Sequence, residues 1–377
     1  MAPVWIEVDL DAVAHNVRAF RGLVPPACRL VAVVKANAYG HGAVPVARAA
    51  LQAGAVALGV ANVREGEELR AAGVTAEIWV LGPCDPADAR ALVEFGLVPG
   101  LGSRELARAL AELPPPRGGR RVPVHVEVDT GMRRHGVPVE ELAPFVRDLR
   151  DRGRLAVQGV FTHFAGLCAD DANDMRAQLA AFHAALASVR DLAAPLRHAA
   201  NTVGTLLLPE ARLDAVRIGG GLYGFDPLGA RSRLALRPAL ALKARVAGLR
   251  HALPGDRVGY GGAFVCARPT RLALLPLGYA DGLVRAMWRD AEVLVRGRRA
   301  RIAGRVSMNQ TVVDVTDVPG VAVGDEVVLL GRQGTQRIAA EERAGADGSV
   351  YEITSLLAPD LPRRFVAATA ERPPVVR

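Results

Sequence analysis

The stretch LVAVVKANAYGHG, from Leu30 to Gly42, decides the fold class and supplies the first candidate for chemistry. Its opening residues, Leu30 to Val34, are apolar and mostly β-branched, which predicts a fully buried strand. Lys35 follows that strand at once. Because an amine at the end of a buried strand is partly desolvated, its pKa falls and it can act as a nucleophile or a base.

Lysine is rare in this chain, which makes Lys35 more conspicuous. Of 47 basic residues only two are lysines, Lys35 and Lys243. Arginine stays protonated and cannot form a Schiff base, so Lys35 is nearly the only candidate for covalent amine chemistry. Lys243 lies with Arg245 on the polar side of an alternating segment, which predicts a solvent-exposed strand lysine.

Length and composition indicate a soluble protein of two domains. The chain has 377 residues, half of them apolar. No apolar stretch approaches the roughly 18 residues that span a bilayer, and the N-terminus lacks the pattern of a secretion signal. The four cysteines are widely separated and form no CxxC motif, so neither a disulfide framework nor a zinc site is expected. We expect a cytoplasmic protein with no membrane partner.

The net charge of +8 raises the question of nucleic-acid binding. Most arginines are scattered singly among alanine, leucine and acidic residues, and only 5% of residues are aromatic. A stacking platform or a groove-reading helix is therefore not expected. The replacement of lysine by arginine fits a GC-rich coding sequence better than a nucleic-acid surface.

Short apolar runs alternate with amphipathic helical patterns from residue 30 to about residue 220. The eight runs are Leu30–Val34, Ala57–Ala61, Ile78–Leu81, Leu97–Leu101, Val122–Val128, Val157–Phe161, Leu196–Ala200 and Ala215–Ile218. Eight strand–helix repeats in about 200 residues predict an α/β fold of the (β/α)₈ TIM-barrel type. We place the barrel domain at residues 1–231.

The pattern changes after about Arg231. Short alternating segments punctuated by glycine, Asp-Gly and Pro-Gly predict a mainly antiparallel β-domain over residues 232–377. The opening WIEVDLDAVAHN, which begins at Trp5, can supply a strand to either domain.

A barrel places its active site at the carboxyl ends of its strands, so the residues after each run are the candidates. They are Lys35, Tyr39, Leu81, Arg134, Thr162, His163, Asn201, Thr202, Arg217, Gly219, Gly220 and Gly221. Taken together on one rim, they indicate a site for a phosphorylated ligand beside a reactive amine. The glycines after the last strand favour the phosphate.

Each of these residues also has a purely structural interpretation. His163 suits a hydrogen-bonded core histidine, and Arg217 suits a salt bridge on the rim. Asn201 and Thr202 suit a helix N-cap. The glycines suit a tight turn, and Tyr39 and Tyr223 suit packing aromatics.

Nine motifs, in order through both predicted domains, resemble those of the alanine racemases, pyridoxal-phosphate enzymes of fold type III. They are VVKANAYGHG, DTGMRRHG, FTHFA, HAANT, VRIGGGLYG, VGYGGAF, LGYADG, GRVSMNQ and VYEIT. The resemblance implies interconversion of L-alanine and D-alanine, with D-alanine supplied for peptidoglycan.

The resemblance also implies how the cofactor is held. Lys35 carries pyridoxal phosphate in a Schiff base and is one of two bases. The phosphate is bound by Tyr39, Thr202, the backbone of Gly219 and Gly220, and Tyr351, with Asn201 and Leu81 beside the cofactor. Arg217 faces the pyridine nitrogen and disfavours its protonation, which fits racemisation rather than transamination.

The second base implied by the resemblance is Tyr260, on the opposite face of the substrate. A phenol needs help to act as a base, and a Tyr260–His163–Arg217 chain provides it. Arg134 and the backbone of Met308 bind the substrate carboxylate. Because Tyr260 and Met308 reach the barrel of another subunit in the family, a homodimer with shared sites is implied. Tyr279 and Tyr351 narrow the entrance.

Four positions depart from the common family pattern: Glu127 for a carbamylated lysine, Asn309 for aspartate, Ser307 for cysteine and Thr202 for serine. Glu127 brings the negative charge that the carbamate supplies, so we predict a direct Glu127–Arg134 pair. The alternative is an outward-facing strand carboxylate.

Three rival functions stay open from the sequence. The first is a serine or broad-specificity racemase. Serine differs from alanine by one hydroxyl, and a tight pocket discriminates only weakly between substrates that differ so little. A fold-type III decarboxylase shares the barrel and the cofactor but fits the Tyr260 surroundings and the pairing of HAANT with RIGGG poorly. From a different class, a non-catalytic pyridoxal-phosphate carrier has a single barrel and no β-domain.

Overall fold

A computed structural model describes residues 2–114, 119–190, 195–229, 232, 234–285, 289–344 and 349–366. The chain divides into two compact units. The barrel unit comprises residues 12–38 and 43–237, and the β unit comprises residues 1–11, 39–42 and 238–377. The domain boundaries drawn from the sequence, 1–231 and 232–377, stay a prediction.

The barrel unit confirms the predicted (β/α)₈ architecture. Eight of its described strands are parallel and close on themselves, because β5 pairs with both β4 and β6. In order around the barrel they are β2 (Arg29–Val33), β3 (Ala57–Val60), β4 (Glu77–Val80), β5 (Val98–Leu101), β6 (Val122–Asp129), β8 (Leu155–Phe161), β9 (Leu196–His198) and β10 (Ala215–Ile218). Every predicted apolar run overlaps one of these strands. A short strand, β7 (Val137–Pro138), adds to β6.

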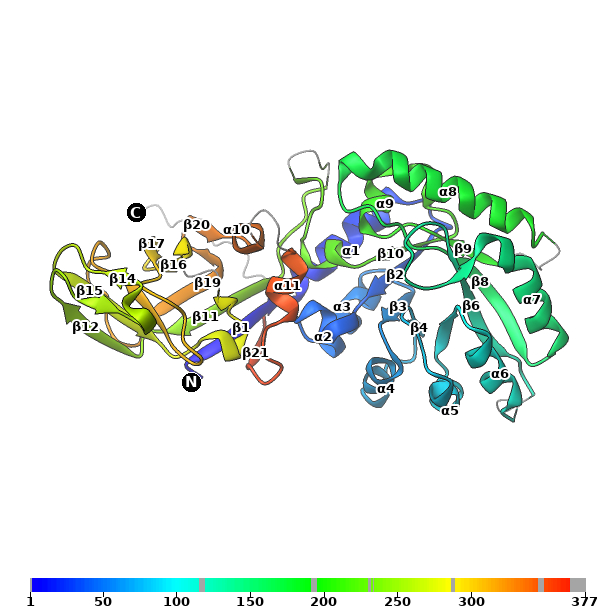
Figure 1. Ribbon diagram of the computed structural model, residues 1–377, viewed down its shortest axis with the longest axis horizontal. Coiled ribbons are helices and arrows are strands. Elements are labelled where there is room, and N and C mark those ends of the chain that lie inside the picture. The colour runs from blue at the N-terminus through cyan, green and yellow to red at the C-terminus, as the bar shows by residue number, and fades with distance from the viewer. Residues whose placement is uncertain are drawn as a thin grey trace, which may run out of the picture. The chain divides into compact units, whose positions relative to one another are not determined.

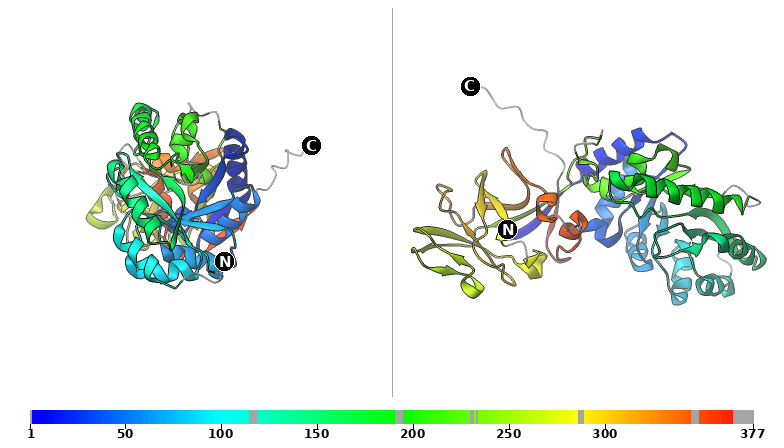
Figure 2. Two further views of the ribbon diagram at one scale, coloured as in Figure 1. Left: turned by 90° about the vertical axis from the view of Figure 1, so that its right-hand side faces the viewer. Right: turned by 45° about the horizontal axis from the view of Figure 1, so that its top comes forward.

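Helices of the barrel unit lie outside these strands (Figures 1 and 2). They are α1 (Leu10–Leu23), α3 (Ala43–Gln52), α4 (Val63–Ala71), α5 (Ala89–Glu94), α6 (Arg104–Glu112), α7 (Leu142–Asp151), α8 (Ala172–Ala187) and α9 (Thr202–Leu207). Their apolar positions recur at helical spacing, so each buries one face and leaves the other to water. In α6, for example, Leu106, Ala107 and Leu110 are buried.

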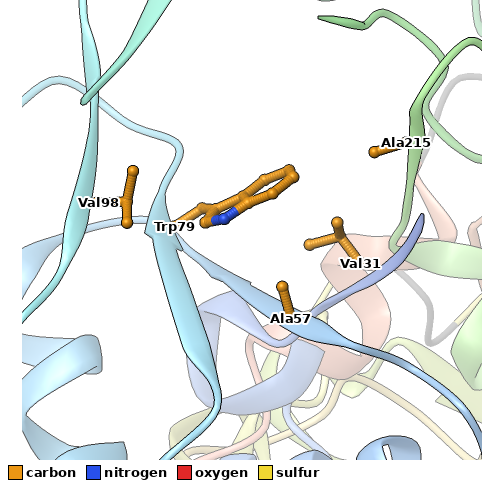
Figure 3. Close-up of a cluster of buried hydrophobic side chains, with 5 residues drawn as sticks. All are labelled: Val31, Ala57, Trp79, Val98 and Ala215. Atoms are coloured by element: carbon orange, nitrogen blue, oxygen red, sulfur yellow. The ribbon is translucent and has the colours of Figure 1, made fainter. Parts of the chain in front are cut away.

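A cluster of apolar side chains from five strands packs together in the barrel unit. Figure 3 shows Trp79 of β4 extending between side chains of β2, β3, β5 and β10. The cluster consists of Val31, Ala57, Trp79, Val98 and Ala215. The indole of Trp79 is also in edge contact with the His125 ring of β6, with centroids 4.5 Å apart. The barrel interior is therefore closed by packing and does not form a pore.

The β unit is mainly antiparallel, as predicted. Its described strands are β1 (Val4–Asp9), β11 (Leu240–Arg245), β12 (Gly248–Ala252), β13 (Arg257–Val258), β14 (Phe264–Val265), β15 (Thr270–Leu275), β16 (Glu292–Val295), β17 (Arg298–Arg301), β18 (Thr311–Asp314), β19 (Glu326–Gln333), β20 (Gln336–Ile338) and β21 (Arg363–Val366). Two short helices, α10 (Ala340–Ala344) and α11 (Val350–Ser355), follow β20. The opening strand β1 pairs with β11 and β21, so it belongs to the β unit.

The predicted exposure of Lys243 is wrong. Its ammonium lies 2.7 Å from Glu7 and 3.4 Å from Glu326, and its side chain is only 15% exposed. The reason is the position of β11, a central strand whose neighbours β1 and β19 carry these two carboxylates. The alternation of residues in the sequence identifies the polar face of β11. Only the pairing of β11 with β1 and β19 shows that carboxylates on these neighbouring strands cover the lysine.

Candidate active site

Lys35 stands between the end of β2 and a left-handed turn. The four residues that follow, Ala36 to Tyr39 in α2 (Lys35–Tyr39), all have positive φ angles between 51° and 54°. Such a conformation costs residues other than glycine roughly 1–2 kcal/mol each, so the surroundings must hold it in place. The Ala38 N–H donates to the Val34 carbonyl, and the Asn37 side chain accepts from the Ala43 N–H, both at 2.8 Å.

The surroundings of Lys35 weaken the proton affinity of its amine. Burial is the largest cause of a lowered Lys35 pKa, and the positive charge of Arg134 lowers it further, while Glu65 acts in the opposite direction. A lysine with a lowered pKa has a larger fraction of the nucleophilic free amine near neutral pH. The predicted reactive amine is therefore supported by its environment.

Arg217 lies in the barrel interior on β10 and is 3% exposed. Its guanidinium donates to the Thr162 carbonyl at 2.8 Å and to the Ala199 carbonyl at 3.0 Å. It also lies 3.5 Å from Nδ1 of His163. Burial lowers the Arg217 pKa to about 10, which still leaves the side chain positively charged at neutral pH. The rim salt-bridge interpretation does not describe this residue, because its hydrogen-bond partners among the described residues are carbonyls and histidine rings.

A pair of buried histidines extends the contacts of Arg217 through the barrel. Arg217 lies 2.7 Å from Nδ1 of His198, whose Nε2 lies 3.0 Å from Nδ1 of His125. A guanidinium only donates, so His198 must accept at Nδ1 and carry its hydrogen on Nε2. His125 then accepts at Nδ1 and carries its own hydrogen on Nε2. These tautomers are assigned from the hydrogen bonds.

The three histidines near Arg217 are neutral at physiological pH. Burial lowers the pKa of His163 to about 3 and that of His125 to about 4, and Arg217 contributes to both shifts. Burial and Arg217 also hold the pKa of His198 well below its ordinary range. The permanent cation therefore stays on Arg217 and is not shared with these rings.

The predicted Glu127–Arg134 pair is wrong. The Glu127 carboxylate lies 2.6 Å from Nδ1 of His135. No hydrogen bond or ion pair of Arg134 occurs within the part of the chain that the structure describes. The backbone register explains the difference. Parallel pairing sets Val137 opposite Val128, so Gly136 lies against Glu127 and His135 reaches its carboxylate.

The Glu127 side chain faces neither bulk solvent nor Arg134. It is 7% exposed, so the alternative of an outward-facing strand carboxylate is also excluded. Its charge still acts on Arg217 and raises the pKa of that guanidinium against the effect of burial. Glu127 is thus an internal counter-charge in the barrel unit.

Two backbone N–H groups of the glycine segment after β10 donate to the same side-chain hydroxyl, that of Thr202. Thr202 Oγ1 accepts from the N–H of Gly219 at 3.1 Å and from that of Gly221 at 3.4 Å. Both lone pairs of the hydroxyl are then used, which leaves its hydrogen to be donated to a further acceptor. Gly220 begins a one-turn helix over Gly220–Tyr223. This donor set suits an anion such as phosphate.

The structural interpretations hold for two of the predicted residues. Asn201 is the N-cap of α9, accepting from the Gly204 N–H at 2.9 Å. Tyr223 is buried, and its hydroxyl donates to the carbonyl of Val33 at the end of β2. Leu81 packs against the cluster around Trp79.

In the β unit, the rings of Tyr39 and Tyr351 meet edge to face, with centroids 5.6 Å apart. These two predicted cofactor residues are 312 positions apart in sequence and are brought together by the fold. The contact is supported by Gly40, where any side chain would collide with the carbonyl of Thr354 in α11.

Tyr260, Tyr279 and Met308 are exposed on the β unit. Tyr260 is 68% and Met308 is 56% exposed, so both side chains are accessible on the surface of the β unit. The Tyr279 N–H donates to the Ser307 carbonyl at 3.0 Å, so the loops that carry Tyr279 and Met308 are joined. Tyr260 stands in a turn between Gly259 and Gly261, both with positive φ.

Sequence reasoning missed four side chains near the site: Glu65, His125, His135 and His198. His198 opens the HAANT motif and His135 lies in DTGMRRHG, so both motifs contained the signal. Glu65 and His125 lie in an ordinary helical pattern and an ordinary strand pattern, and only the tertiary contacts reveal them.

Family models of two domains match nearly all of the chain. The model of the alanine racemase N-terminal domain matches residues 8–227, and that of the C-terminal domain matches residues 239–365. The chain belongs to the alanine racemase family.

Curated and solved alanine racemases agree with this assignment. The alanine racemase of Symbiobacterium thermophilum is 45% identical, with 98% of this chain and 99% of the relative covered. The crystal structure of alanine racemase from Bacillus anthracis with bound L-Ala-P has a TM-score of 0.91 at 35% identity, covering 98% and 96% of the two chains. The alanine racemase of Bartonella henselae, solved with covalently bound pyridoxal phosphate, has a TM-score of 0.86 at 29% identity, covering 97% and 100%.

Proposed function

We propose that this protein is an alanine racemase that uses pyridoxal phosphate to interconvert L-alanine and D-alanine. The observation that carries the proposal is a half-buried Lys35 with a lowered pKa in the same barrel unit as a buried, permanently charged Arg217. Both family models match, and full-length relatives are named alanine racemases. These matches do not favour a single-barrel carrier, a decarboxylase or a serine racemase.

The described residues fit the cofactor. A linkage needs a lysine with an accessible free amine, and Lys35 supplies it. A phosphate needs donors, and the Thr202 hydroxyl has its hydrogen available because both of its lone pairs are used by the Gly219 and Gly221 N–H groups. When bound, pyridoxal phosphate supplies an electron sink that acidifies the hydrogen on Cα of the amino acid.

We assign the phosphate to Thr202, the backbone of Gly220, Tyr39 and Tyr351, with Asn201 and Leu81 beside the ring. Gly219 would support the phosphate through its N–H bond to the Thr202 hydroxyl. Arg217 would hold the pyridine nitrogen of the cofactor. Since Arg217 keeps its own proton and its charge, it disfavours a proton on that nitrogen. The bound cofactor would then be a weaker electron sink, which would favour return of the proton to Cα.

Two bases on opposite faces of Cα account for inversion. Lys35 takes or gives the proton on one face, and Tyr260 does so on the other. His163, which is neutral and lies 3.5 Å from Arg217, connects the Tyr260 phenol to the buried cation. Arg134 and the Met308 backbone bind the substrate carboxylate, and Glu127 acts through His135 and the charge of Arg217.

Tyr260 and Met308 reach the barrel of a second copy in this proposal, so the enzyme is a homodimer with shared sites. Their exposure on the β unit, 68% and 56%, leaves both side chains accessible to a second copy, as the proposal requires. Tyr279 and Tyr351 form the entrance gate and keep the substrate small.

We further infer a cytoplasmic enzyme that supplies D-alanine for peptidoglycan. Within the described residues, every helix is too short or too polar to cross a bilayer.

One experiment tests the function. The purified full chain is loaded with pyridoxal phosphate and incubated with L-alanine, D-alanine or L-serine, and each product enantiomer is measured. Racemisation of both alanine enantiomers, with much slower turnover of serine, is expected. Bound cofactor without turnover contradicts the proposal and favours a carrier. Borohydride reduction and peptide mapping must place the cofactor on Lys35.

A further inference from the structure

Glu65 makes two short backbone contacts beside Lys35. Its Oε1 accepts from the N–H of Ala36 and its Oε2 accepts from the N–H of Ala61, both at 2.7 Å. Ala36 follows Lys35 directly and is the first residue of the left-handed turn. Ala61 follows β3, the strand that pairs with β2. One carboxylate therefore ties the turn to the end of the neighbouring strand.

The carboxylate of Glu65 is itself held in place. Glu65 lies in the first turn of α4, and its N–H donates to the Asn62 side chain at 3.0 Å. A negative charge at the N-terminus of a helix is favoured by the helix dipole. Hydrogen bonds from backbone N–H groups to a carboxylate are also stronger than those between neutral groups.

Lys35 is thus fixed from both sides along the chain. Before it, the Tyr223 hydroxyl donates to the carbonyl of Val33 at 2.9 Å. After it, Glu65 accepts from the Ala36 N–H. The four left-handed residues store strain that local contacts must offset, and the Glu65 contact acts on the first of them.

We propose that Glu65 is a positioning residue for Lys35, whose bridging carboxylate holds the left-handed turn and places a negative charge beside the reactive amine. This inference rests on the proposed function in one respect, the role of Lys35 as the reactive amine.

Two charged groups, Arg134 and Glu65, act on Lys35. Arg134, in the loop after β6, is positive, and His163, after β8, is neutral at physiological pH. Glu65, on α4, is the one carboxylate among the described residues whose charge raises the Lys35 pKa against burial and Arg134. Removing its charge is expected to lower that pKa further.

The test compares Glu65→Gln with Glu68→Gln in the full chain free of cofactor. Glu68 lies on the same helix and pairs with Arg64 at 3.2 Å on an exposed face, so it is a matched control. Glutamine keeps the shape of the side chain but replaces one acceptor oxygen with a donor amide, which cannot bridge two N–H groups.

Two measurements follow the turn and the amine separately. Hydrogen–deuterium exchange by mass spectrometry follows the peptide over residues 31–38. Trace acetylation over a pH series follows the two lysines, with Lys243 as the internal reference. In Glu65→Gln the Ala36 amide should exchange about tenfold faster or more, as expected for loss of a hydrogen bond to a charged acceptor. The midpoint for Lys35 acetylation should move to lower pH, and that of Lys243 should not move.

A third variant, Glu65→Asp, separates charge from geometry and covers the case in which glutamine fails to fold. Aspartate keeps the charge on a shorter arm, so exchange at Ala36 should rise while the Lys35 midpoint stays near that of the wild type. In the loaded enzyme, Glu65→Gln should lower kcat more than it raises KM.

Unchanged Ala36 exchange and an unchanged Lys35 midpoint in Glu65→Gln would overturn the inference. So would equal effects in Glu68→Gln. Because exchange and acetylation are measured without cofactor or alanine, they decide the role of Glu65 even if the protein proves not to racemise alanine.

Discussion

The carboxylate of Glu127 pairs with His135 at 2.6 Å rather than with Arg134. The two candidate partners are adjacent in sequence, yet the parallel register of β7 against β6 brings only His135 to the carboxylate. Arg134 stays exposed while its charge acts on both Lys35 and His163. The negative charge of Glu127 inside the barrel and the exposed positive charge of Arg134 therefore have separate roles in this chain.

Removing the partner of Glu127 should destabilise the fold. His135→Ala leaves a carboxylate that is 7% exposed without its hydrogen bond, so we expect a loss of about 1–3 kcal/mol in the free energy of unfolding. Denaturant unfolding at fixed protein concentration measures it. His183→Ala, on the exposed face of α8, is the control and should change stability by less than about 0.5 kcal/mol. Equal effects of the two variants would contradict the pairing.

The two lysines allow a direct comparison of roles. Lys35→Ala should abolish the borohydride-stable linkage to the cofactor and reduce racemisation from either enantiomer by ~10³-fold or more. Lys243→Arg keeps the charge between Glu7 and Glu326 and should retain the linkage. Peptide mapping after reduction and a racemisation assay provide the two readouts. A linkage that survives in Lys35→Ala and is lost in Lys243→Arg would reverse the assignment.

Tyr260→Phe should separate the two faces of the reaction. Racemisation in both directions should fall, because each direction needs one base to remove the proton and the other to return it. Exchange of the Cα hydrogen with deuterium should persist for the enantiomer that faces Lys35 and be lost for the other. Proton NMR of each enantiomer in heavy water measures both rates. Persistent exchange in both enantiomers would rule out a two-base arrangement.

The buried histidines predict how stability responds to acid. An unfolded histidine has a pKa near ~6.5, whereas burial lowers that of His125 to about 4. Below the unfolded value the unfolded chain binds a proton that the folded chain does not, so the free energy of unfolding falls as pH drops from about 6.5 to 4.

Replacing one of these histidines should make the free energy of unfolding depend less steeply on pH. In His125→Gln the slope over this window should decrease by up to ~1.4 kcal/mol per pH unit, since the amide oxygen still accepts from His198 and does not titrate. Urea unfolding at several pH values measures the slope. His183→Gln, which changes an exposed histidine in the same way, is the matched control. An equal slope in the wild type and His125→Gln would show that this histidine does not titrate between the two states.

Much of the fold was predictable because the residue types within a short segment indicate whether that segment forms a buried strand. The run Leu30–Val34 predicts β2, and seven further runs of the same kind predict the remaining barrel strands. The carboxyl-end rule for barrels then identified Lys35 and Arg217 as candidates. Hydrophobic periodicity is a local property, so it is visible without knowledge of the tertiary structure.

The remaining site contacts depend on positions far apart in sequence. Glu65 reaches Ala36 across 29 positions, and His125 reaches His198 across 73. Nothing in the pattern around either residue differs from an ordinary helix or strand. The same limit explains the error over Lys243, whose cover comes from the neighbouring strands β1 and β19.

The sequence by itself determined the barrel and the β-rich C-terminal part and predicted Lys35 as the reactive amine, because apolar spacing and residue chemistry act over a few neighbouring positions. Only the tertiary structure decided which partner each buried or bridging charged side chain binds: Glu127 binds His135, Glu65 binds the turn after Lys35, and Arg217 binds His198. The physical reason is that an ion pair or hydrogen bond depends on strand register and distance in space. A residue's type states what it can bind, and the fold sets what lies within 3 Å or so of it.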